Sequence, residues 1–277
     1  MEGLATRIGL RIWVVAVLIF LFLPIVTIVV FAFDQSNIET FPIHHFTLHW
    51  FSVAWHDQQM REALYLSIKA AVIATAISLV LGTLAAFGVH RFKFFGREAV
   101  SFLLILPLSL PGIITGIALN SAFAFVNINL GLLTIVIGHA TFCIVVVYNN
   151  VIARLRRVSN TLYEASADLG AHGWQTFRFV SLPMLSTALI SGALLAFALS
   201  FDEVIVTTFT AGAQNTLPLW IFGAIRLGQT LPEVNVVVTF VVLLTLIPVF
   251  IAAKLTGGGG VTRGSAAQTR EAGEARL

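Results

Sequence analysis

The sequence predicts an all-α membrane protein with about six transmembrane helices and with both termini in the cytoplasm. Hydrophobic residues make up 58% of the 277 residues, charged residues make up only 10%, and the mean hydropathy is +0.94. Soluble domains carry about 25% charged residues, so this chain has too little polar surface to cover a globule in water. The chain also alternates long uncharged stretches with short charged ones, as expected of a multi-spanning protein.

Six stretches of the chain are long and apolar enough to cross a bilayer, which requires roughly 20 residues in a helix. The third and fourth form one uncharged run, which we divide at the turn-forming residues Asn127, Asn129 and Gly131. The predicted crossings lie near 12–33, 70–89, 99–126, 130–152, 184–205 and 234–253.

The two ends of the chain are predicted to lie outside the bilayer. The uncharged stretch Ile12–Phe33 is too long for the apolar core of a signal peptide, and no small-residue cleavage pattern follows it. We therefore predict a retained first crossing, preceded by a cytoplasmic N-terminus of residues 1–11. Residues 256–277 are polar and rich in small residues, and we predict a disordered cytoplasmic tail that leaves 12–255 as the transmembrane domain.

Basic residues decide the predicted orientation, because cytoplasmic loops of membrane proteins are enriched in Lys and Arg. With the N-terminus inside, only Arg61 and Arg226 lie outside, and Lys69 lies at the outer edge of the second crossing. The other 13 of the 16 basic residues then lie inside: Arg7, Arg11, Arg91, Lys93, Arg97, Arg154, Arg156, Arg157, Arg178, Lys254, Arg263, Arg270 and Arg276.

The long outer loop after the first crossing holds four histidines beside tryptophan and phenylalanine. A metal site is one interpretation, but two of the histidines are adjacent, no cysteine accompanies them, and their spacing matches no compact zinc pattern. We expect instead a helix that lies in the membrane interface, and no metal site. These loop histidines are His44, His45, His49 and His56.

Two further interruptions of the apolar pattern are expected to bend the chain. Pro107, Pro111 and Gly112 predict kinks in the third crossing, because proline removes a helical hydrogen bond. The uncharged stretch 204–225 is interrupted by glycine, asparagine and proline, which predict an outer loop or a short half-inserted helix.

The inner loop 154–183, between the fourth and fifth crossings, differs from a simple tether. Residues 164–169 favour a helix, and Gly170 is suited to the left-handed conformation that ends one. A second helical stretch follows and ends at Leu182-Pro183. A short helix parallel to the membrane could fit a groove on a soluble partner.

The spacing within this loop resembles the EAA loop of permease subunits of ABC importers. The family pattern is E-A-A-x3-G-x9-I-x-L-P, and this sequence departs from it by Ser166 for Ala and Val180 for Ile. The resemblance implies a type I ABC-importer permease fold with a cytoplasmic coupling helix that docks an ATPase. It assigns the coupling role to Glu164, Ala165, Ser166, Asp168, Gly170, Leu182 and Pro183.

The resemblance covers most of the chain, from about Leu10 to Lys254, and is closest to the C-type permease subunit of spermidine/putrescine importers. It implies an ATP-driven, binding-protein-dependent importer subunit that moves polyamines. An opine or amino-acid derivative, a phosphonate or ferric iron is an alternative solute on a similar scaffold. The segments that carry the resemblance to this permease subunit are 67–91, 106–112, 200–204, 216–223 and 231–235.

The partners that the resemblance implies are a second, related permease subunit, two ATPase subunits and a periplasmic or lipid-anchored solute-binding protein, in addition to membrane lipid. It places the chain in the bacterial inner membrane. The sequence lacks a Gly-rich phosphate loop, so we expect no enzyme activity and no bound cofactor, with ATP and Mg²⁺ held by the partner ATPases. Nothing suggests nucleic-acid binding. A secondary carrier or a membrane enzyme is less consistent with the sequence, which shows no internal repeat and no catalytic constellation.

Asp202 and Glu203 close the otherwise uncharged fifth crossing. At ~1.5 Å per residue they lie roughly 27 Å from Met184, in the outer half of the bilayer or at its surface. Intramembrane carboxylates are costly and suggest function, here the passage of a cation. The alternative is an interfacial helix end, or pairing with Lys69 or Arg226, and the sequence leaves both interpretations open.

Overall fold

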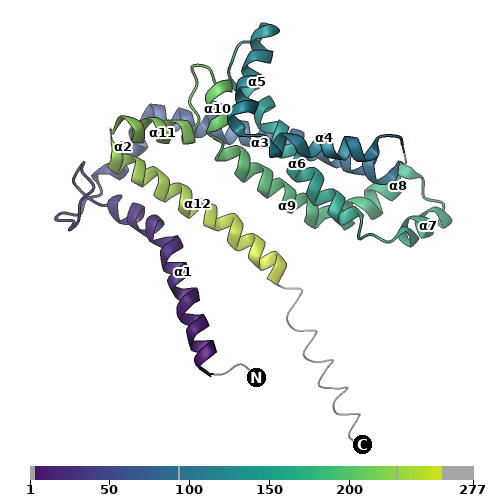
Figure 1. Cartoon of the computed structure of the whole chain (residues 1–277), viewed down its shortest axis with the longest axis horizontal. Coiled ribbons are helices and arrows are strands. Elements are labelled where there is room, and N and C mark those ends of the chain that lie inside the picture. The colour runs from purple at the N-terminus through teal and green to yellow at the C-terminus, as the bar shows by residue number, and fades with distance from the viewer. Residues whose placement is uncertain (1–3, 93, 229, 258–277) are drawn as a thin grey trace, which may run out of the picture. The chain divides into compact units, whose positions relative to one another are not determined.

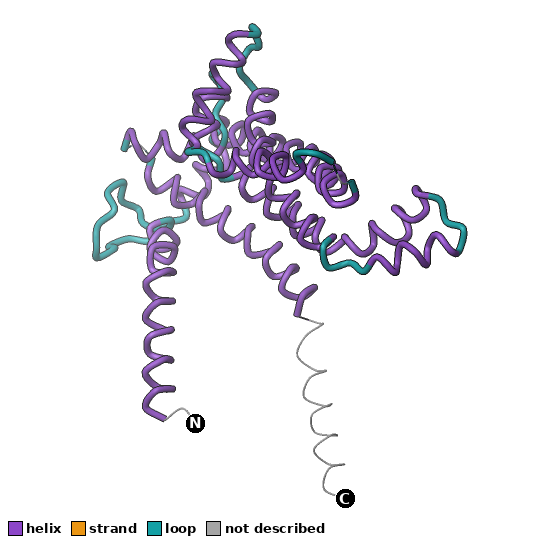
Figure 2. Tube along the Cα trace, turned by 45° about the vertical axis from the view of Figure 1, so that its right-hand side comes forward, coloured by secondary structure: helices purple, strands orange, loops and turns teal. Residues whose placement is uncertain are grey.

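The computed structural model describes residues 4–92, 94–228 and 230–257, and every regular element in these ranges is a helix (Figures 1 and 2). Two compact units divide the chain. The first comprises Met1–His56 and Ala224–Leu277, and the second comprises Asp57–Gly223. Residues 258–277, most of the predicted disordered tail, lie outside the described residues.

The first unit contains α1 (Leu4–Phe31), α2 (His49–His56) and α12 (Leu231–Gly257), and α12 packs against both other helices. Phe51 of α2 lies between two aromatic rings, with centroids 5.1 Å from Phe33 and 5.9 Å from Phe240. A short helix therefore forms in the outer loop where the sequence predicted one. Among the described residues, no group of three His, Cys, Asp or Glu side chains is arranged to hold a metal ion.

The second unit is a bundle around α6. This helix packs against α3 and α9 along its length and also contacts α4, α5 and α10. A further helix, α11 (Leu217–Leu227), spans the boundary between the two units. The helices of this unit are α3 (Gln58–Arg91), α4 (Arg97–Ser109), α5 (Gly112–Phe125), α6 (Leu132–Leu155), α7 (Asn160–Asp168), α8 (Gly173–Thr176), the π-helix η1 (Phe177–Ser181), α9 (Leu182–Phe201) and α10 (Ile205–Thr210).

Aliphatic and aromatic side chains of α6 form the centre of the bundle. Val147, Val151 and Leu155 are buried along one side of the helix, together with Tyr148. Small residues on the neighbouring helices let their backbones approach closely, as is typical of helices that pack in a membrane. The closest of these approaches to α6 is at Gly82 of α3, where an added Cβ would lie 2.9 Å from the Ile144 carbonyl oxygen.

Four helices among the described residues are long and apolar enough to cross a membrane: Thr6–Phe31, Gln58–Arg91, Leu132–Leu155 and Gly173–Phe201. The pair α4 and α5 would supply a fifth if its two bent parts form one span. These helices contain the predicted crossing at 70–89, the crossing at 12–33 up to Phe31, the crossing at 184–205 up to Phe201, and nearly all of 130–152. Six crossings in total remain a prediction.

The range 99–126, where the sequence predicted a kinked crossing, consists of two helices bent by 103°. The helix α4 ends at Ser109, and Leu110 is extended with ψ 142°. A residue before proline is disfavoured in the helical conformation, so Pro111 forces Leu110 out of the helix and starts α5 in a new direction.

We expect Gly82→Ala to weaken the α3–α6 contact. The new Cβ would lie 2.9 Å from the carbonyl oxygen of Ile144 and 2.9 Å from Cβ of Val147, so the helices must separate. Such overpacking costs about 1–3 kcal/mol. Thermal unfolding in detergent should show a lower midpoint, by roughly 2–4 °C per kcal/mol. Gly88→Ala on the same helix is the control, since its Cβ meets nothing within 4 Å; equal midpoints for the two variants would contradict this packing.

Candidate functional site

The inner loop predicted to couple the chain to an ATPase folds into two short helices, α7 and α8. Ser159 caps the start of α7, where its hydroxyl accepts a hydrogen bond from the Thr161 N–H. At the other end Gly170 has φ +78°, the left-handed conformation predicted from the sequence. Hydrogen bonds from Ala171 N–H to Ser166 O and from Gly170 N–H to Ala167 O complete a Schellman motif. The turn between α7 and α8 therefore has a defined geometry.

The second short helix continues into the following crossing. The π-helix η1 joins α8 to α9, and Gly173–Phe201 is helical throughout. Within η1 the Leu182 N–H bonds the Phe177 carbonyl, five residues earlier. Pro183 accounts for this wider turn, because proline lacks an N–H and its ring crowds the carbonyl four residues before it. In Figure 1, α7 and α8 lie at one end of α9 and α10 lies at the other.

Side chains tie the loop to itself and to α3. The hydroxyls of Ser166 and Thr176 lie 2.9 Å apart and join α7 to α8. The Phe177 ring stacks on Trp174, with centroids 5.5 Å apart, and meets the edge of Phe87 of α3 at 5.7 Å. Ser166, the residue that departs from the family pattern, thus has a hydrogen-bond partner within the loop.

The outward surface of the loop combines apolar and acidic side chains. Leu169 is 88% exposed, and Trp174 is 63% exposed although one face of its ring stacks on Phe177. Glu164 and Asp168 of α7 are exposed as well. Of the other predicted coupling residues, Ala165, Leu182 and Pro183 are exposed and Ser166 is buried.

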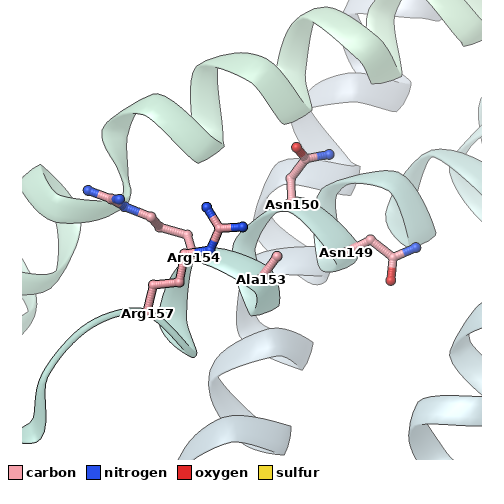
Figure 3. Close-up of a pocket in the computed structure, with 5 residues that line it drawn as sticks. All are labelled: Asn149, Asn150, Ala153, Arg154 and Arg157. Atoms are coloured by element: carbon pink, nitrogen blue, oxygen red, sulfur yellow. The ribbon is translucent and has the colours of Figure 1, made fainter. Parts of the chain in front are cut away.

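A cavity of about 370 Å³ lies at the C-terminal end of α6 (Figure 3). Asn149 and Asn150 point in different directions, and Asn150 donates to the Val146 carbonyl of its own helix. Arg154 donates from Nε to the Met184 carbonyl at 3.0 Å, which ties α6 to the start of α9. The lining residues are Asn149, Asn150, Ala153, Arg154 and Arg157.

At the opposite end of α9, the two predicted carboxylates lie where the helix stops. Asp202 is the C-cap of α9 and is exposed, and its carboxylate has no hydrogen bond or ion pair in the described part of the chain. Glu203 is half-buried, and its Oε1 accepts the Val206 N–H at 2.9 Å, which caps the start of α10. The two side chains therefore have different structural roles.

The alternative pairing of these carboxylates with Lys69 is not seen. Lys69 is exposed, its Nζ lies 5.8 Å from the centre of the Tyr65 ring, and the described residues contain no ion pair between it and Asp202 or Glu203. Of the two carboxylates, Asp202 is the one without a hydrogen bond or ion pair among the described residues.

Sequence reasoning missed His139, which is buried in α6. Its two ring nitrogens are hydrogen-bonded to Ser200 and Thr207, which precede and follow the two carboxylates in the sequence. The signal was present in the sequence, since a histidine inside an uncharged apolar span is costly unless it has partners.

Comparison with known proteins gives one family and a consistent set of relatives. Residues 78–256 match the family described as binding-protein-dependent transport system inner membrane component. The putrescine transport system permease protein PotI of Escherichia coli K12 is 34% identical over 80% of this chain and 81% of its own length. The spermidine/putrescine transport system permease protein PotC of Haemophilus influenzae is 31% identical over 86% of this chain and 92% of its own length.

Solved structures give the same fold at lower identity. A chain of a bacterial ABC transporter that imports the acidic polysaccharide alginate has a TM-score of 0.66 and 18% identity, covering 94% of this chain and 99% of that one. A chain of the MetNI methionine ABC transporter in an inward-facing conformation has a TM-score of 0.58 and 18% identity, covering 76% of this chain and 97% of that one. The all-α permease fold predicted from the sequence is thereby confirmed.

We expect Gly170→Ala to loosen the turn between α7 and α8. An alanine in the left-handed conformation costs about 1–2 kcal/mol, which corresponds to a factor of about 5–30 in a local opening equilibrium. Hydrogen–deuterium exchange of peptides covering 160–176 should accelerate by that factor. Gly173→Ala is the matched control in the same loop, because its backbone is not left-handed and its Cβ meets nothing within 4 Å. If both variants exchanged alike, the turn would not depend on Gly170.

Proposed function

Because this chain belongs to the family of binding-protein-dependent transport system inner membrane components, we propose that it is one of two permease subunits of an ATP-driven importer for polyamines. It is a multi-pass protein of the bacterial inner membrane and a transport component. The observation that carries the choice of solute is the identity of 31–34% to putrescine and spermidine/putrescine permeases over 80–86% of the chain.

The chemistry of the carboxylate end of α9 supports a cationic solute. A polyamine is a flexible apolar chain with an ammonium group at each end, and it must exchange water for acceptors when it enters an apolar channel. Asp202 offers an exposed carboxylate without a partner in the described part of the chain. A carboxylate within a bilayer is costly, and a passing ammonium would offset that cost. Glu203 lies next to it but is engaged as a helix cap.

The loop end of α9 supports docking to a separate ATPase. The loop exposes the apolar side chains of Leu169 and Trp174 and the acidic side chains of Glu164 and Asp168. Such a combination fits a groove with an apolar floor and basic or backbone donors at its rim. We propose that two ATPase subunits bind ATP and Mg²⁺ and that one of them holds this loop. A second, related permease and a periplasmic or lipid-anchored binding protein complete the importer.

The continuous helix from Gly173 to Phe201 offers a direct mechanical link between the two ends. Its 29 residues span roughly 43 Å at ~1.5 Å per residue. Movement of α8 by a closing ATPase pair would be carried along α9 to Asp202. The π-turn at Phe177–Ser181 is the place where this helix can change its register, since its hydrogen bonds are wider than those of an α-helix.

A second solute is favoured by one comparison. The putative 2-aminoethylphosphonate transport system permease protein PhnV of Salmonella paratyphi A is 27% identical over 83% of this chain. This compound shares an ammonium group with polyamines but carries a phosphonate at its other end. A lone carboxylate would attract the first group and repel the second, so the structure favours the polyamine.

Uptake by cells that lack their own polyamine importers tests the solute. We expect the complete importer containing this chain to restore ATP-dependent uptake of radiolabelled putrescine or spermidine, and excess unlabelled 2-aminoethylphosphonate should not compete. A matched importer with an ATPase that binds but cannot hydrolyse ATP controls for passive entry. Uptake of 2-aminoethylphosphonate without uptake of either polyamine would reject the proposed solute.

Asp202→Asn tests the proposed solute path. Removing the negative charge while keeping the size of the side chain should raise the KM for putrescine uptake about tenfold, which corresponds to about 1.4 kcal/mol of lost attraction. Glu203→Gln is the matched comparison: its amide oxygen can still accept the Val206 N–H, so we expect a smaller change in KM. Unchanged uptake by Asp202→Asn, with a normal amount of assembled importer, would remove this carboxylate from the path.

A further inference from the structure

The helix break that presents the two carboxylates is joined across its gap by one side chain of α6. The helix α9 ends at Phe201 and α10 begins at Ile205. His139 is only 1% exposed, and its Nδ1 lies 2.7 Å from Oγ of Ser200, in the last turn of α9. Its Nε2 lies 2.8 Å from Oγ1 of Thr207, in α10. The imidazole therefore holds both sides of the break.

The direction of each hydrogen bond follows from Thr207. Its hydroxyl donates to the Glu203 carbonyl at 2.7 Å, so its oxygen accepts from His139 Nε2–H. His139 Nδ1 then accepts from the Ser200 hydroxyl. One tautomer of the neutral ring satisfies the whole chain of bonds from Ser200 to the Glu203 carbonyl. Polar groups this deeply buried are costly when unpaired, which makes the arrangement specific.

The neighbouring bonds show why this bridge matters to the carboxylates. The six residues of α10 are too few to hold a helix by themselves. Asn120 Nδ2 donates to Phe209 O at 2.7 Å, and Thr134 Oγ1 donates to Thr210 O at 2.7 Å. Both contacts fix the far end of α10. Among the described side chains, the His139 imidazole is the one hydrogen-bonded to both α9 and α10, and so it sets the angle at Asp202.

We propose that His139 is a positioning residue for solute transfer: through Ser200 and Thr207 it fixes the break between α9 and α10 and thereby holds the Asp202 carboxylate toward the passing cation. This inference rests on the proposed function, in which Asp202 lines the path. His139 itself is buried among the helices and does not touch the solute.

Thr207→Val tests the proposal with little change of shape, and Thr207→Ser is the matched control that keeps the hydroxyl. In the complete importer, at equal amounts of assembled complex, Thr207→Val should raise the KM for putrescine uptake about tenfold. Thr207→Ser should stay within about twofold of the unsubstituted importer, since the bond to His139 is kept. His139→Gln is a second variant and should raise KM in the same way. A fall in maximal rate with unchanged KM would mean a structural role only and would overturn the inference.

The same measurement in an Asp202→Asn background separates this inference from the function it rests on. If His139 acts through the carboxylate, Thr207→Val should no longer change KM when Asp202 is already neutralised. A full KM effect of Thr207→Val in that background would overturn the inference even if Asp202 proved important. If Asp202→Asn alone had no effect, the solute path would be wrong instead.

A readout that needs no solute completes the test. Hydrogen–deuterium exchange of peptides covering 200–211 should accelerate in Thr207→Val and His139→Gln and stay unchanged in Thr207→Ser. Unchanged exchange in all three variants would show that the break holds without His139 and would overturn the proposal.

Discussion

Burial of backbone polar groups is the constraint on which the second unit depends. A helix satisfies its own N–H and C=O groups, whereas each break in an apolar chain leaves some of them without partners. This chain breaks between α4 and α5 and between α9 and α10. At the second break, Glu203 accepts the Val206 N–H and the Thr207 hydroxyl donates to the Glu203 carbonyl, while Asn120 and Thr134 donate to backbone carbonyls at the far end of α10.

The helix α6 can serve this purpose because it is the most enclosed helix of the bundle. Buried Val147, Val151 and Leu155 fix it between α3 and α9, and the tight contact at Gly82 brings the α3 backbone close. A polar side chain on such a fixed helix has a defined position, so its hydrogen bonds impose geometry on the short helix α10. The apolar packing of α6 thus fixes the positions from which its polar side chains make their hydrogen bonds.

The two ends of α9 combine into one mechanical proposal. One end continues through a π-turn into the exposed apolar and acidic loop, and the other end presents Asp202. A force applied at Trp174 and Leu169 would reach the carboxylate through a single helix whose far end is held by His139. Coupling over such a distance requires an element with two discrete arrangements, and the π-turn is the candidate in this chain.

The sequence by itself determined the membrane class, the apolar stretches that form the long helices and the loop at 154–183, because long apolar runs and a left-handed glycine act locally. Gly170 could be assigned from its place after a helix-forming segment, and the uncharged runs 70–89 and 130–152 lie wholly or almost wholly within the helices Gln58–Arg91 and Leu132–Leu155. Only the tertiary structure decided the 103° bend at Pro111 and the partners of His139. Proline shows in the sequence that a helix is disturbed, but the angle depends on what the two halves pack against. His139, Ser200 and Thr207 are far apart along the chain, and no local pattern could show that they meet.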